Sequence, residues 1–292
     1  MISSTSPSLP FSLLGHSRGP VILASPHSGR DYPADFLART PLTVAQLRLA
    51  EDAFVDQLLA GAVSVGAQML AARYGRCYLD LNRAADELDP TMFSDAPDQL
   101  TRRIGERTAA GLGILPRVAA HGLNIYSGRL KLADAESRIA ALHQPWHARL
   151  DELTAAAVDE FGYAILLDCH SMPTLPGGNG RVAPQFVIGD LHGRSAAPAL
   201  VAAIDRCLRL DGWQVARNAP YAGGYTTARH GRPRSGVHTV QIEIDRALYM
   251  DAPKLTPHAG FHRVAASLRR VVETLLRDSG QFGLSPFAQA AE

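Results

Sequence analysis

Short, uninterrupted apolar runs alternate with longer segments of helical periodicity along most of this chain, and this alternation limits the possible folds most strongly. An uninterrupted apolar run bounded by turn residues is typical of a strand buried on both faces. Apolar residues three or four positions apart predict an amphipathic helix. Strands are predicted over 21–25, 67–74, 76–82, 163–171, 184–190, 213–218 and 237–245, and helices over 43–66, 132–162, 195–212 and 262–280. We therefore predict an α/β fold with a mixed, largely parallel central sheet flanked by helices.

The chain has no internal repeat and no evident linker, so we expect a single domain over residues 1–292. Roughly the first 15 residues are rich in serine and proline and are expected to be loosely ordered. Residues 84–123 predict a long surface excursion, which is uncommon unless it serves a function. The helix over 132–162 should break or kink near Pro145. Residues 221–236 are glycine-rich and predict a long loop.

Composition excludes several classes of partner. The formal net charge is +1, so no electrostatic field favours nucleic acid or a membrane surface. We find no apolar run long enough for a transmembrane helix and no signal-peptide pattern at the N-terminus. The three cysteines lack the spacing of a disulfide framework or a metal site. We expect a cytoplasmic protein that binds a small molecule, with neither a nucleic-acid nor a membrane partner, and the oligomeric state stays open.

Polar side chains follow or interrupt four of the predicted strands. Ligands of open α/β sheets bind at the carboxyl ends of the strands, so these side chains are expected to meet at one edge. They are His27, Asn82 with Arg83, Asp168 with His170, and Glu243. A strand-end histidine is on its own more often a surface or capping residue, so the convergence carries the argument rather than any single residue.

Two histidines and one carboxylate make a common catalytic zinc site. His27 and His170 are the best histidine pair, and Asp52 or Glu51 would complete the set. His₂–carboxylate ligation also suits other divalent metals, so zinc is favoured without being unique. The alternative to a ligand role is that Asp52 is an ordinary solvent-exposed residue of the predicted helix.

A general base and a substrate-carboxylate site are needed beside such a metal. Glu243 is the natural base, because a lone carboxylate in an apolar strand is costly without a role or a partner. Arg83 with Asn82 could bind a substrate carboxylate, although Arg83 could equally pair with a nearby aspartate. Cys169 and Ser171 are weak nucleophile candidates: Cys169 and its neighbour His170 point to opposite faces, and Ser171 lacks a nucleophile elbow.

Five short motifs in order resemble the N-formylglutamate amidohydrolase family, from about residue 21 to residue 251. They are "SPHSGRDYP", "YLDLNRAADELDP", "LLDCHSMP", "NAPYAGGYTT" and "VQIEIDRALYMD". The resemblance implies a fold similar to that of zinc carboxypeptidases and aspartoacylase. It also implies hydrolysis of N-formyl-L-glutamate to formate and glutamate, a step of bacterial histidine degradation.

The resemblance implies roles for individual residues. His27 and His170 match its histidine ligands of zinc, and "EDAFVDQL" puts Asp52 forward as the carboxylate ligand, with Glu51 and Asp56 as alternatives. Glu243 matches its general base. The pair Asn82–Arg83 resembles the carboxylate-binding pair of the wider group. Asp168, two residues before His170 on the same strand face, is expected to orient a histidine or the metal-bound water.

One motif departs from the family pattern. After "GGYTT" the family commonly has a histidine two residues on, whereas this chain has Arg229 there and His230 one place later. This loop, with Gly224, Thr227 and Arg229, is expected to border the substrate, and Arg229, Arg232 or Arg129 would hold a side-chain carboxylate. The departure leaves the acyl group and the amino acid open. Alternatives are another N-acyl amino acid hydrolase, a carboxypeptidase-like peptidase, or a binding protein without catalysis.

Overall fold

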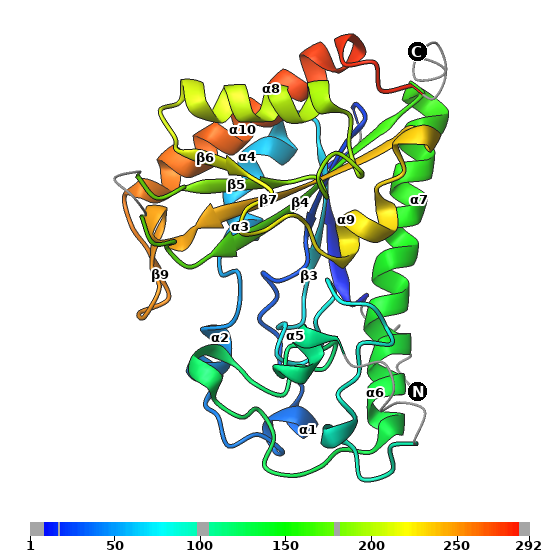
Figure 1. The fold of residues 1–292 in the computed structure, drawn as a ribbon, viewed down its shortest axis with the longest axis vertical. Coiled ribbons are helices and arrows are strands. Elements are labelled where there is room, and N and C mark those ends of the chain that lie inside the picture. The colour runs from blue at the N-terminus through cyan, green and yellow to red at the C-terminus, as the bar shows by residue number, and fades with distance from the viewer. Residues whose placement is uncertain (1–8, 17, 98–104, 178–181, 286–292) are drawn as a thin grey trace, which may run out of the picture.

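A seven-stranded mixed sheet forms the centre of the computed structural model, which describes residues 9–16, 18–97, 105–177 and 182–285 (Figure 1). Its strand order is β1-β3-β2-β4-β7-β5-β6. β1 and β5 run antiparallel to β3 and β7, and the other neighbouring pairs are parallel. The strands are β1 (Phe11–Leu14), β2 (Val21–Ser25), β3 (Gln68–Ala72), β4 (Ala164–Met172), β5 (Phe186–Gly189), β6 (Val215–Arg217) and β7 (Val237–Asp245). The predicted α/β fold with a largely parallel sheet is confirmed.

Helices cover both faces of this sheet. Figure 1 shows α8 (Pro198–Leu210) and α10 (Gly260–Asp278) on one side and α7 (Gln144–Phe161) on the other. The remaining helices are short: α1 (Ala34–Leu37), α2 (Val44–Arg48), α3 (Val55–Leu58), α4 (Ala60–Ser64), α5 (Glu106–Ala109), α6 (Leu132–Arg138) and α9 (Tyr225–His230). A small separate hairpin is formed by β8 (Met250–Asp251) and β9 (Thr256–Pro257).

The core follows from the alternation of side chains along strands that are buried on both faces. Leu23 of β2 belongs to the same apolar cluster as Val264 of α10, whereas its neighbour Ile22 belongs to the cluster of Trp146 in α7. Full burial of such aliphatic side chains contributes roughly 1.5–3 kcal/mol each to stability. All residues of β2, β4 and β7 are buried, which explains the continuous apolar run of β2 and of the first half of β4. In β7, buried polar residues alternate with apolar ones.

Below the carboxyl edge of the sheet, a third and smaller apolar cluster is built around Phe36 and Ile125. It includes parts of the long excursion that follows β3. Figure 1 shows α1, α2 and α5 in this lower region, away from the helices that cover the sheet. Tyr78 and Tyr126 pack against both this cluster and the one under α7, so the two are continuous.

Three predicted elements differ from the structure. The predicted helix over 43–66 is divided into α2, α3 and α4, and Phe54 between them has a left-handed backbone with φ 66°. Residues 76–82, predicted as a strand, form turns, because Asp80 and Asn82 are drawn into the polar site described below. The predicted loop over 221–236 contains α9.

Two further expectations concern the N-terminus and Pro145. The first eight residues lie outside the described part, but Phe11–Leu14 form β1, so the expected loose order is wrong for these four. The physical reason is that β3 satisfies their backbone groups and that Phe11 is buried against Trp146. The predicted helix over 132–162 is interrupted as expected, by a π-helical turn over Ile139–His143 just ahead of Pro145.

Candidate active site

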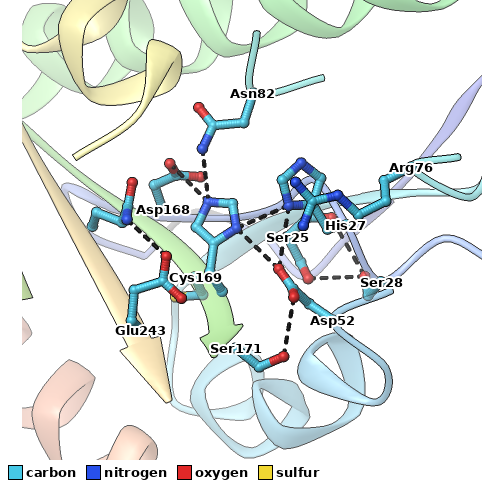
Figure 2. Close-up of polar contacts among 12 residues, drawn as sticks. Ser25, His27, Ser28, Asp52, Arg76, Asn82, Asp168, Cys169, Ser171 and Glu243 are labelled. Carbon is cyan, nitrogen blue, oxygen red and sulfur yellow. Dashed lines mark hydrogen bonds and ion pairs between the residues drawn. The ribbon is translucent and has the colours of Figure 1, made fainter. Parts of the chain in front are cut away.

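Three buried side chains meet at the carboxyl edge of the sheet (Figure 2). His27 follows β2, His170 lies near the end of β4, and Asp52 lies between α2 and α3. The Nδ1 atom of His27 is 3.2 Å from Asp52 Oδ2 and 3.1 Å from His170 Nδ1. His170 Nδ1 is 3.0 Å from the same carboxylate oxygen. Each atom is therefore close enough to the other two to share one cation.

The donor set fits a zinc ion or a similar divalent metal. Zinc bonds of about 2.0–2.1 Å in tetrahedral geometry separate ligand atoms by roughly 3.3 Å, close to the distances here. Burial alone would raise the pKa of Asp52, but hydrogen bonds from His170 and His27 and the charge of Arg246 hold it well below its usual range. Asp52 is therefore an anion, as a metal ligand must be.

A carboxylate holds the second ring nitrogen of each histidine. His27 Nε2 lies 2.7 Å from Asp80 Oδ1, and His170 Nε2 lies 3.0 Å from Asp168 Oδ2. Because an ionised carboxylate only accepts, Asp80 and Asp168 favour a hydrogen on each Nε2, so Nδ1 is the atom that each histidine can offer to a cation once it loses its own hydrogen. The amide nitrogen of Asn82 also lies 3.1 Å from His170 Nε2. Carboxylate partners of this kind fix the tautomer and the orientation of metal-binding histidines.

The second oxygen of Asp52 is also held. Arg246 Nη2 donates to Asp52 Oδ1 over 2.8 Å, and Ser171 Oγ donates to it over 3.0 Å. Arg246 Nε in turn donates to Ser171 Oγ over 2.9 Å. These contacts turn Oδ2 toward the two histidines and leave Asp52 little rotational freedom.

The local backbone explains why Asp52 leaves the predicted helix. Its amide nitrogen donates to the carbonyl of His27 over 2.9 Å, which ties the 49–54 segment to the end of β2. A capping box on Thr43 starts α2, and the left-handed Phe54 ends the irregular stretch. A continuous helix would use the Asp52 amide within the helix itself and would break this bond.

Glu243 lies beside the cluster on β7, opposite His170 in the β4–β7 register. Gln241 Nε2 donates to its Oε1 over 2.8 Å. Burial raises the pKa of the Glu243 carboxyl to about 7. A carboxyl with this pKa can both accept and deliver a proton near neutral pH, which suits a general base and acid.

The cluster opens into a cavity of about 990 Å³ between the sheet edge and the lower region. Its charged lining includes Arg76, Arg83, Arg107 and Arg246. Arg76 is paired with Asp80 and Arg246 with Asp52. Arg83 makes only long ion pairs, with Asp80 at 4.0 Å and Glu87 at 3.7 Å, and its buried Nε has no hydrogen-bond partner among the described residues. A guanidinium group of this kind at a cavity wall is suited to a carboxylate ligand.

The structure also distinguishes among the three carboxylates that the sequence left as candidate metal ligands. Glu51 accepts hydrogen bonds from Tyr32 and Arg48, and Asp56 pairs with Arg30, so Asp52 is the carboxylate that faces both histidines. The predicted substrate residues Asn82, Arg83 and Gly224 line the cavity.

Other predicted substrate residues lie elsewhere. Thr227 is buried and donates to the carbonyl of Gly224, and Arg229 pairs with Asp151 outside the cavity lining. Arg232 also pairs with Asp151, and Arg129 lines a separate small pocket. The structure therefore does not place these four side chains at the cavity; Arg229 is drawn away because α9 is docked on Asp151 of α7. Cys169 packs in the core as expected.

Residues 19–250 match the family described as N-formylglutamate amidohydrolase. The chain belongs to this family. An N-formylglutamate deformylase of Pseudomonas aeruginosa is 31% identical over 94% of this chain and 99% of the relative. One of Pseudomonas putida is 26% identical over 80% of this chain and 83% of the relative. The crystal structure of N-formylglutamate amidohydrolase from Ralstonia eutropha JMP134 is 34% identical and has a TM-score of 0.84, covering 94% of this chain and 98% of that one.

Family membership makes the chain a hydrolytic enzyme, as the motifs predicted. The resemblance read from the five motifs is thereby confirmed. Among the residues that the structure describes, no helix is long and apolar enough to cross a membrane.

Sequence reasoning about this N-formylglutamate amidohydrolase family member missed four polar residues of the site: Asp80, Arg76, Arg107 and Arg246. A signal for Asp80 was present, since it lies two positions before Asn82 in "YLDLNR". Arg246 directly follows the strand that carries Glu243, at the edge where ligands bind. Arg107 lies in the long excursion, where no strand end marks it.

Proposed function

We propose that this protein is a zinc-dependent amidohydrolase that cleaves N-formyl-L-glutamate to formate and L-glutamate, in the degradation of histidine. The observation that carries the proposal is the buried cluster of His27, Asp52 and His170 beside Glu243, in a cavity with four arginines. Both Pseudomonas relatives are named N-formylglutamate deformylase, which supports the substrate.

His27, Asp52 and His170 would hold the metal through the three atoms that face one another. When bound, the metal lowers the pKa of water and polarises the substrate carbonyl. The site supports this chemistry because Asp80, Asp168 and Arg246 fix the three ligands in orientation before any substrate binds.

Glu243 would accept a proton from the attacking water and deliver it to the nitrogen of glutamate as the C–N bond breaks. One water is consumed, and formate and the free amine are formed. Glu243 suits both transfers because its pKa is raised to about 7 by burial. Gln241 holds one of its oxygens, so the other is free to face the reacting groups.

The substrate carries two carboxylates, and the cavity offers cations for both. Arg83 and Asn82 would bind the α-carboxylate. Thr226 N donates to Asn82 Oδ1 over 2.7 Å, which directs the Asn82 amide nitrogen into the site. Arg107 lines the cavity, is exposed, and has no carboxylate partner among the described residues, so we assign it the side-chain carboxylate.

A second candidate is the hydrolysis of a larger N-acyl amino acid with the same residues. The cavity volume of about 990 Å³ favours it, since pockets of this size hold ligands much larger than a formylated amino acid. We also propose a reducing, cytoplasmic location, because Cys77, Cys169 and Cys207 are free thiols.

A substrate panel tests the proposal. The purified protein is incubated with N-formyl-, N-acetyl- and N-succinyl-L-glutamate and with N-formyl-L-glutamine and N-formyl-L-leucine, and free amine is measured. We expect the highest kcat/KM for N-formyl-L-glutamate. A higher kcat/KM for a longer acyl group would support the second candidate, and no release from any compound would contradict both.

A further inference from the structure

In the part of the chain that the structure describes, three of the four buried histidines outside the metal-binding cluster lie next to one another and have no role in the chemistry above. His143 and His147 belong to the π-helical turn and α7, and His230 ends α9. Their exposed fractions are 4%, 2% and 0%. We call them the histidine ladder. His230 is also the residue by which this chain departs from the family motif.

The ladder makes hydrogen bonds to the backbone of segment 81–83. His147 Nε2 lies 2.9 Å from the carbonyl oxygen of Leu81, and His143 Nε2 lies 2.9 Å from that of Arg83. A carbonyl only accepts, so both Nε2 atoms must donate. His147 Nδ1 is then an acceptor, and His230 Nε2 donates to it over 2.9 Å. The hydrogen bond from His147 to Leu81 therefore fixes the tautomer of His147, and His147 in turn determines that His230 carries its hydrogen on Nε2.

Neighbouring elements hold the ladder in place. His143 and His147 are four residues apart, which puts both rings on the same side of the interrupted helix, 4.3 Å between centroids. Tyr225 at the start of α9 packs against both rings. Arg229 donates to Asp151 of α7 over 2.8 Å, so α9 is docked on α7 at both of its ends.

Segment 81–83 itself has no regular structure. Its side chains nevertheless include Asn82 and Arg83, which line the cavity beside the metal-binding cluster. Besides the ladder, the start of α9 holds this segment: a Cβ on Gly224 would collide with the Asn82 amide, and Thr226 N donates to its oxygen. The position of both cavity side chains is therefore set by α7 and α9.

We propose that the histidine ladder is a positioning device for substrate carboxylate binding: His143 and His147 hold the carbonyls on either side of Asn82, and His230 holds His147. This inference rests on the proposed function. The ladder itself makes no hydrogen bond to His27, Asp52, His170 or Glu243 in the described residues. Asn82 Nδ2, which it positions, lies 3.1 Å from His170 Nε2, so metal content is measured for each variant to separate an effect on substrate position from one on the metal.

The test compares variants that remove a donor with variants that keep one. His143→Leu and His147→Leu remove the hydrogen bonds to segment 81–83, whereas His143→Gln retains an N–H donor. His238→Leu is the matched control, because His238 is equally buried and lies 2.8 Å from a backbone carbonyl, that of Leu284, away from the cavity. KM and kcat for N-formyl-L-glutamate and the melting temperature are measured for each purified protein.

We expect both ladder leucine variants to raise KM about tenfold with kcat within about twofold of the wild type, since a displaced binding group weakens substrate binding. His143→Gln should recover most of the loss. His238→Leu should lower the melting temperature and leave KM unchanged. For 4-formamidobutanoate, which lacks the α-carboxylate, wild type and ladder variants should have similar kcat/KM.

An unchanged KM in folded ladder variants, or an equal loss with 4-formamidobutanoate, would overturn the inference. Should the His147→Leu chain fail to fold, His143→Leu carries the test, because His143 has a single backbone contact. Calorimetric binding of L-glutamate to wild type and variants separates the two proposals. Weaker glutamate binding by the variants together with no formate release by the wild type would contradict the proposed function alone.

Discussion

At the scale of single residues, the contacts that fix the metal-binding atoms are made on the far side of each imidazole ring. Asp80 accepts from His27 Nε2 at 2.7 Å, and its other oxygen accepts from Arg76 at 2.7 Å. Burial would raise the pKa of Asp80, but His27 and Arg76 hold it well below its usual range. A charged Asp80 keeps the His27 tautomer in the form that can bind a metal.

Replacement of Asp80 by asparagine should therefore weaken metal binding. We expect Asp80→Asn to lower zinc affinity by about 10–100-fold, because outer carboxylate partners have effects of this size. Competition with a fluorescent chelator measures the affinity. Asp89→Asn is the control, since Asp89 is an equally buried carboxylate that binds Arg117 away from the cluster. Equal affinities of Asp80→Asn and wild type would show that this contact has no influence on the metal.

Glu243 allows a second test at the same scale. Glu243→Gln removes the proton acceptor but keeps the size of the side chain and a partner for Gln241. We expect kcat to fall by about 10²–10⁴-fold, the usual contribution of a general base, with metal content unchanged. Steady-state kinetics with elemental analysis measures both. Full activity of a metal-loaded Glu243→Gln enzyme would rule out the assigned role.

The sequence predicted His27, His170, Asp52 and Glu243 as one group because each is an ionisable residue at or near an apolar strand end, or at the start of a helical pattern. It did not predict Arg246 as the partner of Asp52. That contact joins residues 194 positions apart, and the place of Arg246 after β7 marks it as a residue of the ligand edge without indicating its partner. Pairings of this kind depend on the packed sheet rather than on local pattern.

At the scale of elements, strands were predictable where burial alone shapes them. β4 and β7 are fully buried, and their positions were predicted correctly from the apolar run that begins β4 and from the alternation of Val240, Ile242 and Ile244 in β7. The segments 49–54 and 76–83 were not predictable as irregular, because their apolar periodicity is normal and their backbone is diverted by site contacts. The Asp52 amide bonds to the His27 carbonyl and Asp80 bonds to the His27 ring. In these two segments, the contacts that build the site outweigh the local preference for a helix or a strand.

The turn after β2 gives a test at this scale. A Cβ on Gly29 would collide with the backbone carbonyl of Tyr74, which cannot move away easily. We expect Gly29→Ala to lower the free energy of unfolding by about 1–3 kcal/mol, as overpacking does, and to weaken metal binding by displacing His27. Urea denaturation checks the first effect. Gly128→Ala, where a Cβ meets nothing within 4 Å, should change stability by less than about 0.5 kcal/mol. Equal stability of the two variants would contradict the close approach.

At the scale of the whole molecule, we propose that the chain is one domain with a single unfolding transition. The support is that Tyr78 and Tyr126 join the lower cluster to the core under α7. In the sequence, the lack of a linker was the reason to expect one domain. It could not show how the long excursion packs, because that segment carries no periodic pattern and is held by side chains from distant elements.

Acid should destabilise this unit through the buried ladder. Burial lowers the pKa of His147 to about 2 and that of His230 to about 4, below the value of about 6.5 in an unfolded chain. The neutral rings therefore favour the fold above pH 6.5, and this contribution is lost as the pH falls from 6.5 toward 4, by up to about 1.4 kcal/mol per histidine and pH unit. Urea denaturation at several pH values should show a shallower pH dependence for His147→Gln than for the wild type. Identical slopes would contradict the burial of a neutral His147.

The central claim is that His27, Asp52 and His170 hold a metal on which formate release depends. The most direct measurement is elemental analysis of the purified protein together with formate release from N-formyl-L-glutamate, before chelation, after chelation and after zinc is returned. We predict about one metal ion per chain, loss of formate release with the metal, and recovery on its return, with no binding by Asp52→Ala. Undiminished formate release from metal-free protein would contradict the account.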